Sequence, residues 1–301
     1  MSTDRLITRI VELQNPTVVG VDPTLQIVPP HLFAQAHGEN PFERAANALT
    51  TWGRDLVDAL CDIVPAIKPQ LACYEQFRYE GMKAYYDTVQ YAKEKGMFVI
   101  ADAKRGDIGS SSDCYANAHL GTVELYGEPT PVFSADALTI NSYLGSDGIL
   151  PFVRTGKLIF PLVRTSNPSA VEFQDIHHNG RPLYTIVAEH IGELGKDSIG
   201  WYGYSLIGAV VGATYPAELK ALRKILPHTF FLVPGYGAQG GSAADCTGAF
   251  DNRGLGAVIN SSRAILGAWQ LSSDGNHFAN HARTAAITMR DELRTAIGKI
   301  G

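Results

Sequence analysis

Lysines and aspartates stand at the ends of three short apolar runs in this sequence. Asp22 follows the first run, Lys68 the second, and Asp102, Lys104 and Asp107 the third. Opposite charges that alternate within a few ångströms can keep lysines protonated and carboxylates ionised even in a partly dry cavity. An ion-pair network that only closes the fold is the alternative for any one of them. Their common place at the ends of apolar runs favours a chemical role.

The spacing within residues 102–107 adds to this interpretation. Residues two apart in an extended segment share a face, so Asp102 and Lys104 are expected to point into one cavity. Asp107 lies beyond the run, where Gly106 and Gly109 allow the chain to turn sharply. Asp107 can therefore serve its own site or that of a neighbouring copy.

Two further segments have the composition of a phosphate site. Residues 233–241 are rich in glycine, which lets backbone N–H groups approach an anion, and Gln239 adds a side-chain amide. Residues 259–263 end in Arg263, whose guanidinium can make paired, charge-assisted bonds to phosphate beside a helix start. Each segment alone also fits an ordinary surface turn. Together they favour phosphate.

An uncharged polar cluster follows a fifth apolar run. Ser166 and Asn167 offer hydroxyl and amide groups that suit the edge of a neutral ring. The alternative is that they cap the next helix, which Ser-Asn-Pro does well. With the phosphate segments and the charged cluster, they outline a nucleotide-shaped site that has no set of metal ligands.

The elements that must position these residues form an alternating pattern. Short runs rich in Val, Ile and Phe alternate with helical periodicity, which is typical of a parallel sheet with crossover helices. Eight such units predict an α/β fold of the (β/α)8 TIM-barrel type, in one domain over residues 1–301. A doubly wound open sheet is the alternative. The expected strands are 17–21, 63–67, 97–101, 131–135, 158–163, 207–211, 229–233 and 256–260, and expected helices include 42–57, 79–95, 216–225 and 280–297.

Two stretches exceed what a barrel requires. Residues 23–62 and 168–206, after the first and fifth strands, are expected to add helices or loops at the catalytic rim. The second stretch contains His177 and His178. Adjacent residues do not share one face of a helix, so a solvated loop is expected there rather than a metal site.

Composition excludes several classes of protein. The 301 residues carry a net charge of -5 with no basic block, so we expect no nucleic-acid partner. No run of eighteen apolar residues occurs, and residues 1–13 read as an amphipathic helix rather than a signal peptide, so we expect no membrane association. The four cysteines lack the spacing of a disulfide scaffold or a zinc site. Reduced thiols and a cytoplasmic location are expected.

The motifs give the sequence a resemblance to a known family. Asp-Ala-Lys-Arg-Gly-Asp-Ile-Gly at 102–109, Thr-Ser-Asn-Pro at 165–168 and Pro-Gly-Tyr-Gly-Ala-Gln-Gly-Gly at 234–241 resemble the longer bacterial branch of the orotidine 5′-phosphate decarboxylases. The resemblance covers residues 19–263. It implies a (β/α)8 barrel that acts as a homodimer, uses no cofactor, and converts orotidine monophosphate to uridine monophosphate and carbon dioxide in the last step of de novo pyrimidine synthesis.

The resemblance also implies a role for each matching residue. Lys104 would donate the proton to the ring carbon that loses its carboxylate, between Asp102 and the partner subunit's Asp107. Ser111 would also come from the partner. Lys68 and Asp22 would bind the ribose hydroxyls, and Lys68 would also keep Asp102 ionised. Ser166 would read the pyrimidine, and Gln239 with Arg263 would hold the phosphate.

Three alternatives stay open on the sequence alone. A sister sugar-phosphate decarboxylase of the same superfamily would use the first motif with magnesium. A barrel that only binds a nucleotide would be stabilised by its ligand without turning it over, and an aldolase would form a Schiff base on its lysine. One position departs from the expected pattern: Ser142 stands where the family would have proline, which concerns only the shape of that loop.

Overall fold

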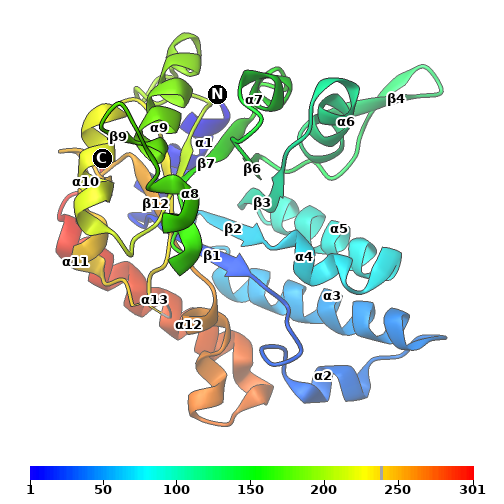
Figure 1. The fold of residues 1–301 in the computed structure, drawn as a ribbon. Coiled ribbons are helices and arrows are strands. Elements are labelled where there is room, and N and C mark those ends of the chain that lie inside the picture. The colour runs from blue at the N-terminus through cyan, green and yellow to red at the C-terminus, as the bar shows by residue number, and fades with distance from the viewer. Residues whose placement is uncertain (238–239) are drawn as a thin grey trace.

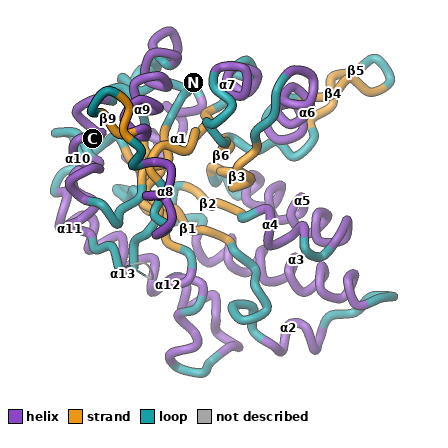
Figure 2. Tube along the Cα trace, in the orientation of Figure 1, coloured by secondary structure: helices purple, strands orange, loops and turns teal. Residues whose placement is uncertain are grey.

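The computed structural model describes residues 1–237 and 240–301, and its centre is a closed parallel barrel. Going round the barrel, the strands follow the order β1, β2, β3, β6, β7, β10, β11 and β12, and β12 pairs with β1. In Figure 2 the orange strands of the barrel lie at the centre with purple helices around them. The predicted (β/α)8 barrel is confirmed. The strands are β1 Thr17–Val21, β2 Ala66–Pro69, β3 Phe98–Arg105, β6 Ala137–Ile140, β7 Leu158–Arg164, β10 Ala209–Val211, β11 Phe231–Pro234 and β12 Ala257–Ser261.

Helices pack around the strands, and two hairpins project from them (Figure 1). The first hairpin, β4 with β5, stands out beside α6, whereas the second, β8 with β9, precedes α9. The helices are α1 Ser2–Leu13, α2 Pro30–Gln35, α3 Pro41–Leu60, α4 Leu71–Glu75, α5 Arg78–Glu94, α6 Gly109–His119, α7 Ser146–Val153, α8 Val171–Gln174, α9 Leu183–Leu194, α10 Pro216–Ile225, α11 Ala243–Cys246, α12 Arg263–Leu266 and α13 Phe278–Ile297, and the hairpin strands are β4 Thr122–Leu125, β5 Glu128–Pro131, β8 His177–His178 and β9 Arg181–Pro182.

The prediction of the fourth barrel strand is wrong. Residues 131–135 were expected to form it, but the strand is β6, from Ala137 to Ile140. Ser134 has a φ of 59°, which an extended strand does not allow, and Phe133 packs instead on the ring of His119. Apolar side chains in this run therefore cover a helix rather than forming the barrel wall.

The second strand also begins later than predicted. It was expected at 63–67, but the backbone N–H groups of Ile63 and Val64 both donate to the carbonyl of Leu60, at 3.0 Å each. These bonds end α3 with a tight turn and delay β2 to Ala66. Lys68 therefore lies inside the strand rather than after it.

The two long stretches both contain additional elements. Residues 23–62 hold α2 as well as α3, and residues 168–206 hold α8 and the β8–β9 hairpin as well as α9. His177 and His178 are exposed on that hairpin. The β4–β5 hairpin was not predicted. No helix within the described residues has the length and apolar character needed to cross a membrane.

The amino-terminal helix closes one end of the barrel. Leu6 and Ile7 of α1 are fully buried in the cluster that fills the barrel interior. Thr3 Oγ1 donates to the carbonyl of Ser205 at 2.9 Å, and Ser2 Oγ donates to that of Asp136 at 2.7 Å. Both acceptors precede a barrel strand, so α1 covers the amino-terminal end.

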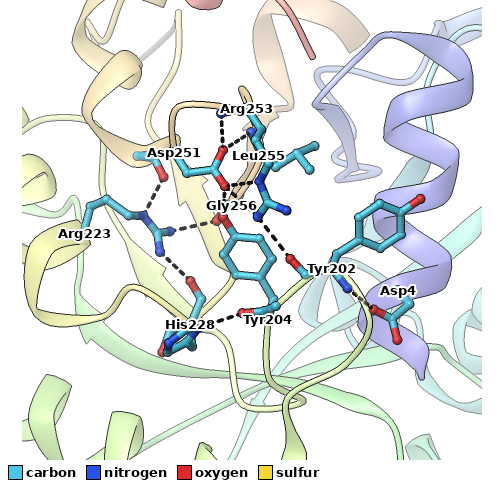
Figure 3. Close-up of polar contacts among 12 residues, drawn as sticks. Asp4, Tyr202, Tyr204, Arg223, His228, Asp251, Arg253, Leu255 and Gly256 are labelled. Atoms are coloured by element: carbon cyan, nitrogen blue, oxygen red, sulfur yellow. Dashed lines mark hydrogen bonds and ion pairs between the residues drawn. The ribbon is translucent and has the colours of Figure 1, made fainter. Parts of the chain in front are cut away.

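Arg223 fixes the segments that enter two of the strands (Figure 3). Its guanidinium lies 3.7 Å from the ring centroid of Phe231 and donates to the carbonyls of Thr229 and Gly256 at 2.8 Å each. Nearby, Tyr204 donates to Asp251 at 2.9 Å. This network stabilises the amino-terminal end of the barrel and leaves the opposite end for a site.

Candidate active site

A cavity of about 480 Å³ opens at the carboxyl ends of the barrel strands. Side chains that point into a barrel recur every second residue along each strand. Val18, Ala66, Ile100, Ala137 and Val258 form an apolar layer in the interior. The next inward positions on these strands are Gly20, Lys68, Asp102, Thr139 and Asn260. The floor of the cavity is therefore polar where the layer below it is apolar.

Asp102 joins two lysines on this floor. Lys68 Nζ donates to Oδ2 of Asp102, and Lys104 Nζ donates to Oδ1 at 2.6 Å. Lys68 and Asp102 are buried, whereas the side chain of Lys104 is 48% exposed and extends into the cavity. The carboxylate thus holds one ammonium in the barrel wall and a second where a ligand would meet it.

Lys68, Asp102 and Lys104 form an ion-pair cluster, and opposite charges keep its buried members ionised. Burial disfavours the ammonium of Lys68, but the carboxylates of Asp102 and Asp22 outweigh burial and raise its pKa above the usual value. Burial likewise disfavours the carboxylate of Asp102, but the ammonium groups of Lys68 and Lys104 hold its pKa far below the usual range. Asp102 is therefore an anion throughout the neutral pH range.

Thr139 positions the ion-pair cluster, and it was not among the predicted site residues. Its hydroxyl donates to Oδ1 of Asp102 at 2.9 Å and accepts from the backbone N–H groups of Ala103 and Lys104 at 3.1 and 3.0 Å. The register of β3 against β6 shifts between Ala101 and Arg105, and Lys104 has a φ of 47°. Thr139 therefore supports a strained bulge that turns Lys104 into the cavity. The misplaced fourth strand concealed its inward position.

Asp22 lies beside the ion-pair cluster, directly after β1. It lines the cavity, and its buried Oδ1 has no hydrogen-bond partner among the described residues. Because a buried carboxylate oxygen normally has a donor, this atom is placed to accept one from a ligand.

One of the two residues predicted to bind phosphate lies at the cavity. Arg263, the first residue of α12, lines the cavity with Gly235 and Tyr236. The hydroxyl of Tyr236 donates to Glu292 of α13, which ties the loop after β11 to the outer helices. Gln239, the other predicted phosphate ligand, lies outside the described residues.

The polar loop after β7 is fixed by contacts with the second insertion. Ser166 and Asn167 line the cavity, and Gln174 of the second insertion bonds both Thr165 N and Thr165 Oγ1, at 2.9 and 2.7 Å. The buried Arg164 pairs with Asp175 at 2.7 Å. These contacts fix the loop that carries Ser166.

Two predicted residues lie outside the cavity of the single chain. Asp107, in the loop after β3, accepts from the backbone N–H of Ile108 at 2.8 Å, and Ser111 is exposed in the first turn of α6. Ser142, the departure noted above, donates to the carbonyl of Leu162 at 2.7 Å and so ties its loop to β7.

Comparisons with known proteins agree on one family. The family model described as orotidine 5′-phosphate decarboxylase / HUMPS family matches residues 45–273. The chain is 42% identical to the orotidine 5′-phosphate decarboxylase of Rhodopirellula baltica, over 92% of this chain and 94% of the relative. It is 38% identical to that of Caldicellulosiruptor bescii, over 98% of each chain. Among solved structures, the OMP decarboxylase of Leishmania donovani superposes with a TM-score of 0.73 at 28% identity, over 98% of each chain.

The ion-pair cluster predicts that Asp102→Asn lowers the stability of the protein in a pH-dependent way. Loss of the carboxylate leaves Lys68 buried and unpaired, so the free energy of unfolding at pH 7 should fall by about 3–5 kcal/mol. Because the pKa of Asp102 is lowered by folding, its stabilisation is complete above the unfolded pKa of about 3.9 and disappears as the pH falls toward the folded value. Urea denaturation from pH 3 to 8 measures the difference between the two proteins. A stability difference that stays constant down to pH 3, or that is as small as the one caused by Asp107→Asn, would contradict the proposed pairing of Asp102 with the two lysines.

The bulge predicts that Thr139→Val destabilises the fold although it preserves shape. The substitution leaves two backbone N–H groups and one carboxylate oxygen without the hydroxyl, at a cost of about 1–3 kcal/mol. Thr139→Ser keeps the hydroxyl and is the matched control, with a change below about 1 kcal/mol. Urea denaturation of both variants at pH 7 decides the matter, and equal losses would show that the hydroxyl is not what supports the bulge.

Proposed function

Because the chain belongs to the orotidine 5′-phosphate decarboxylase family, we propose that it converts orotidine monophosphate to uridine monophosphate and carbon dioxide with Lys104 as the proton donor. The observation that carries this assignment is the Lys104 ammonium, held 2.6 Å from Asp102 at the surface of the cavity. The other catalytic residues are Asp102, Asp107 and Lys68.

The proposed reaction makes a carbanion that the ring cannot delocalise. The bond from the ring carbon to the carboxylate breaks, carbon dioxide leaves, and the electron pair stays on that carbon. An ammonium held at this atom stabilises the negative charge as it develops, and it then gives up a proton to form the new C–H bond. Lys104 afterwards regains a proton from water. Asp102 holds the ammonium in place before each turnover.

The rest of the cavity divides the nucleotide among three sides. Arg263 and Gln239 bind the phosphate, Asp22 and Lys68 bind ribose hydroxyls, and Ser166 binds the edge of the pyrimidine. The unpartnered Asp22 Oδ1 supports the ribose assignment, since a hydroxyl supplies the donor that this oxygen lacks. Phosphate binding is far from the reacting bond, so its energy serves to close the loop and exclude water.

A second copy of the chain completes the site in this proposal. Asp107 and Ser111 stand outside the cavity of their own chain, beside the exposed side chains of Ile108, Tyr143 and Leu144. Apolar side chains of this size at a rim are typical of an interface between subunits. Association through this face would bring Asp107 of one copy to Lys104 of the other.

The function is tested by turnover of orotidine monophosphate in the presence of a chelator. The purified chain should produce uridine monophosphate, followed by the ultraviolet change, and Lys104→Ala should lower kcat by at least about a thousandfold because it removes both the ammonium and the proton. Lys83→Ala, at an exposed lysine of α5, is the control. Turnover that needs an added divalent metal, or that survives Lys104→Ala, would refute the assignment.

The phosphate assignment predicts a separate defect for Arg263→Ala. Loss of a charge-assisted pair at the phosphate should lower kcat/KM by a factor that corresponds to about 2–5 kcal/mol of transition-state stabilisation, without unfolding the protein. Adding guanidinium ion should restore part of the lost activity, which a structural defect would not allow. An unchanged kcat/KM would remove Arg263 from the phosphate site.

A further inference from the structure

Asn260 is a buried polar residue that no step of the proposed reaction uses. It lies on β12 in the inward layer that forms the floor of the cavity, and it is only 7% exposed. Its side-chain carbonyl oxygen, Oδ1, has no hydrogen-bond partner among the described residues. A buried amide oxygen without a donor destabilises the fold, whereas an apolar side chain would avoid that cost.

The neighbours of Asn260 explain why the oxygen has no donor. On one side it is in register with Pro234, which carries no backbone N–H and no polar side chain. On the other side is Gly20 of β1, where an added methyl group would lie 3.2 Å from Asn260 Oδ1 and 1.9 Å from Ser262 Oγ. Gly20 brings no side chain to the amide, and the Ser262 hydroxyl that fills the space beside Gly20 makes no hydrogen bond with Oδ1.

The position of Asn260 limits which part of a nucleotide can reach it. β12 lies next to β1, which leads to Asp22, and it continues past Asn260 to Arg263 at the phosphate side. The floor between these two residues faces the sugar that links ring and phosphate. Phosphate oxygens and ring carbonyls are acceptors, and the N–H of the ring lies on the pyrimidine edge that the proposed function assigns to Ser166, so these groups do not satisfy Oδ1. The ribose hydroxyls are the donors that a nucleotide offers at this place.

We propose that Asn260 is a further substrate-binding residue, whose Oδ1 accepts a hydrogen bond from a ribose hydroxyl. This inference rests on the proposed function, because it takes the ligand of the cavity to be a ribonucleotide. It gives Asn260 a role in discriminating ribose from a sugar that lacks the hydroxyl, since a deoxy sugar leaves the buried oxygen unpaired.

A double-mutant cycle between protein and substrate tests the proposal. The kcat/KM of the wild type and of Asn260→Ala is measured with orotidine monophosphate and with its 2′-deoxy and 3′-deoxy analogues. Asn260→Ala should lower kcat/KM for the ribonucleotide about tenfold, and it should cause no further loss for the analogue that lacks the bound hydroxyl. An equal loss with all three substrates, or no loss with the ribonucleotide, would overturn the proposal.

A control and a binding measurement separate this proposal from others. Thr17→Val removes another buried, unpartnered oxygen from the neighbouring strand but lies outside the cavity, so kcat/KM should not change. Calorimetric titration with uridine monophosphate and its 2′-deoxy and 3′-deoxy forms needs no turnover. If the wild type binds these nucleotides without decarboxylating orotidine monophosphate, the proposed function fails. In that case the binding data alone test the role of Asn260: loss of the preference for the hydroxyl in Asn260→Ala supports it, and an unchanged preference overturns it.

Discussion

The site depends on the carboxylate of Asp102, which pairs with two ammonium groups at once. One oxygen contacts Lys68 inside the barrel wall, and the other lies 2.6 Å from Lys104 Nζ at the cavity surface. A buried charge is tolerated only when it is paired and hydrogen-bonded, so the buried Lys68 and Asp102 require each other. Because Lys68 anchors the carboxylate, the carboxylate can in turn hold the Lys104 ammonium at the surface of the cavity.

The barrel makes this arrangement possible because its interior is built in layers. Apolar side chains and α1 fill the amino-terminal half of the interior, which excludes water from below. The layer above places Lys68, Asp102, Thr139 and Asn260 on separate strands, so their side chains converge although they are far apart in sequence. The bulge in β3 then turns Lys104 inward, and the hydroxyl of Thr139 offsets part of the strain.

The sequence predicted much of this site because its charged residues stand out against apolar runs. The barrel followed from that contrast and is confirmed, and the structure places the predicted Asp22, Lys68, Asp102 and Lys104 around one cavity. Thr139 was missed because β6 is only four residues long and closely follows another apolar run, 131–135, that was expected to form the strand. Asn260 was missed for a different reason: whether a polar group has a partner depends on neighbours across the barrel, which a single sequence does not reveal.

The distance from Lys104 Nζ to the pyrimidine tests the central claim most directly. In a crystal structure of the protein with bound uridine monophosphate, the nitrogen should lie about 3 Å from the ring carbon that carried the carboxylate, while it keeps its contact with Asp102. A nitrogen that points away from the ring, or that has left Asp102 for solvent in the complex, would contradict the account.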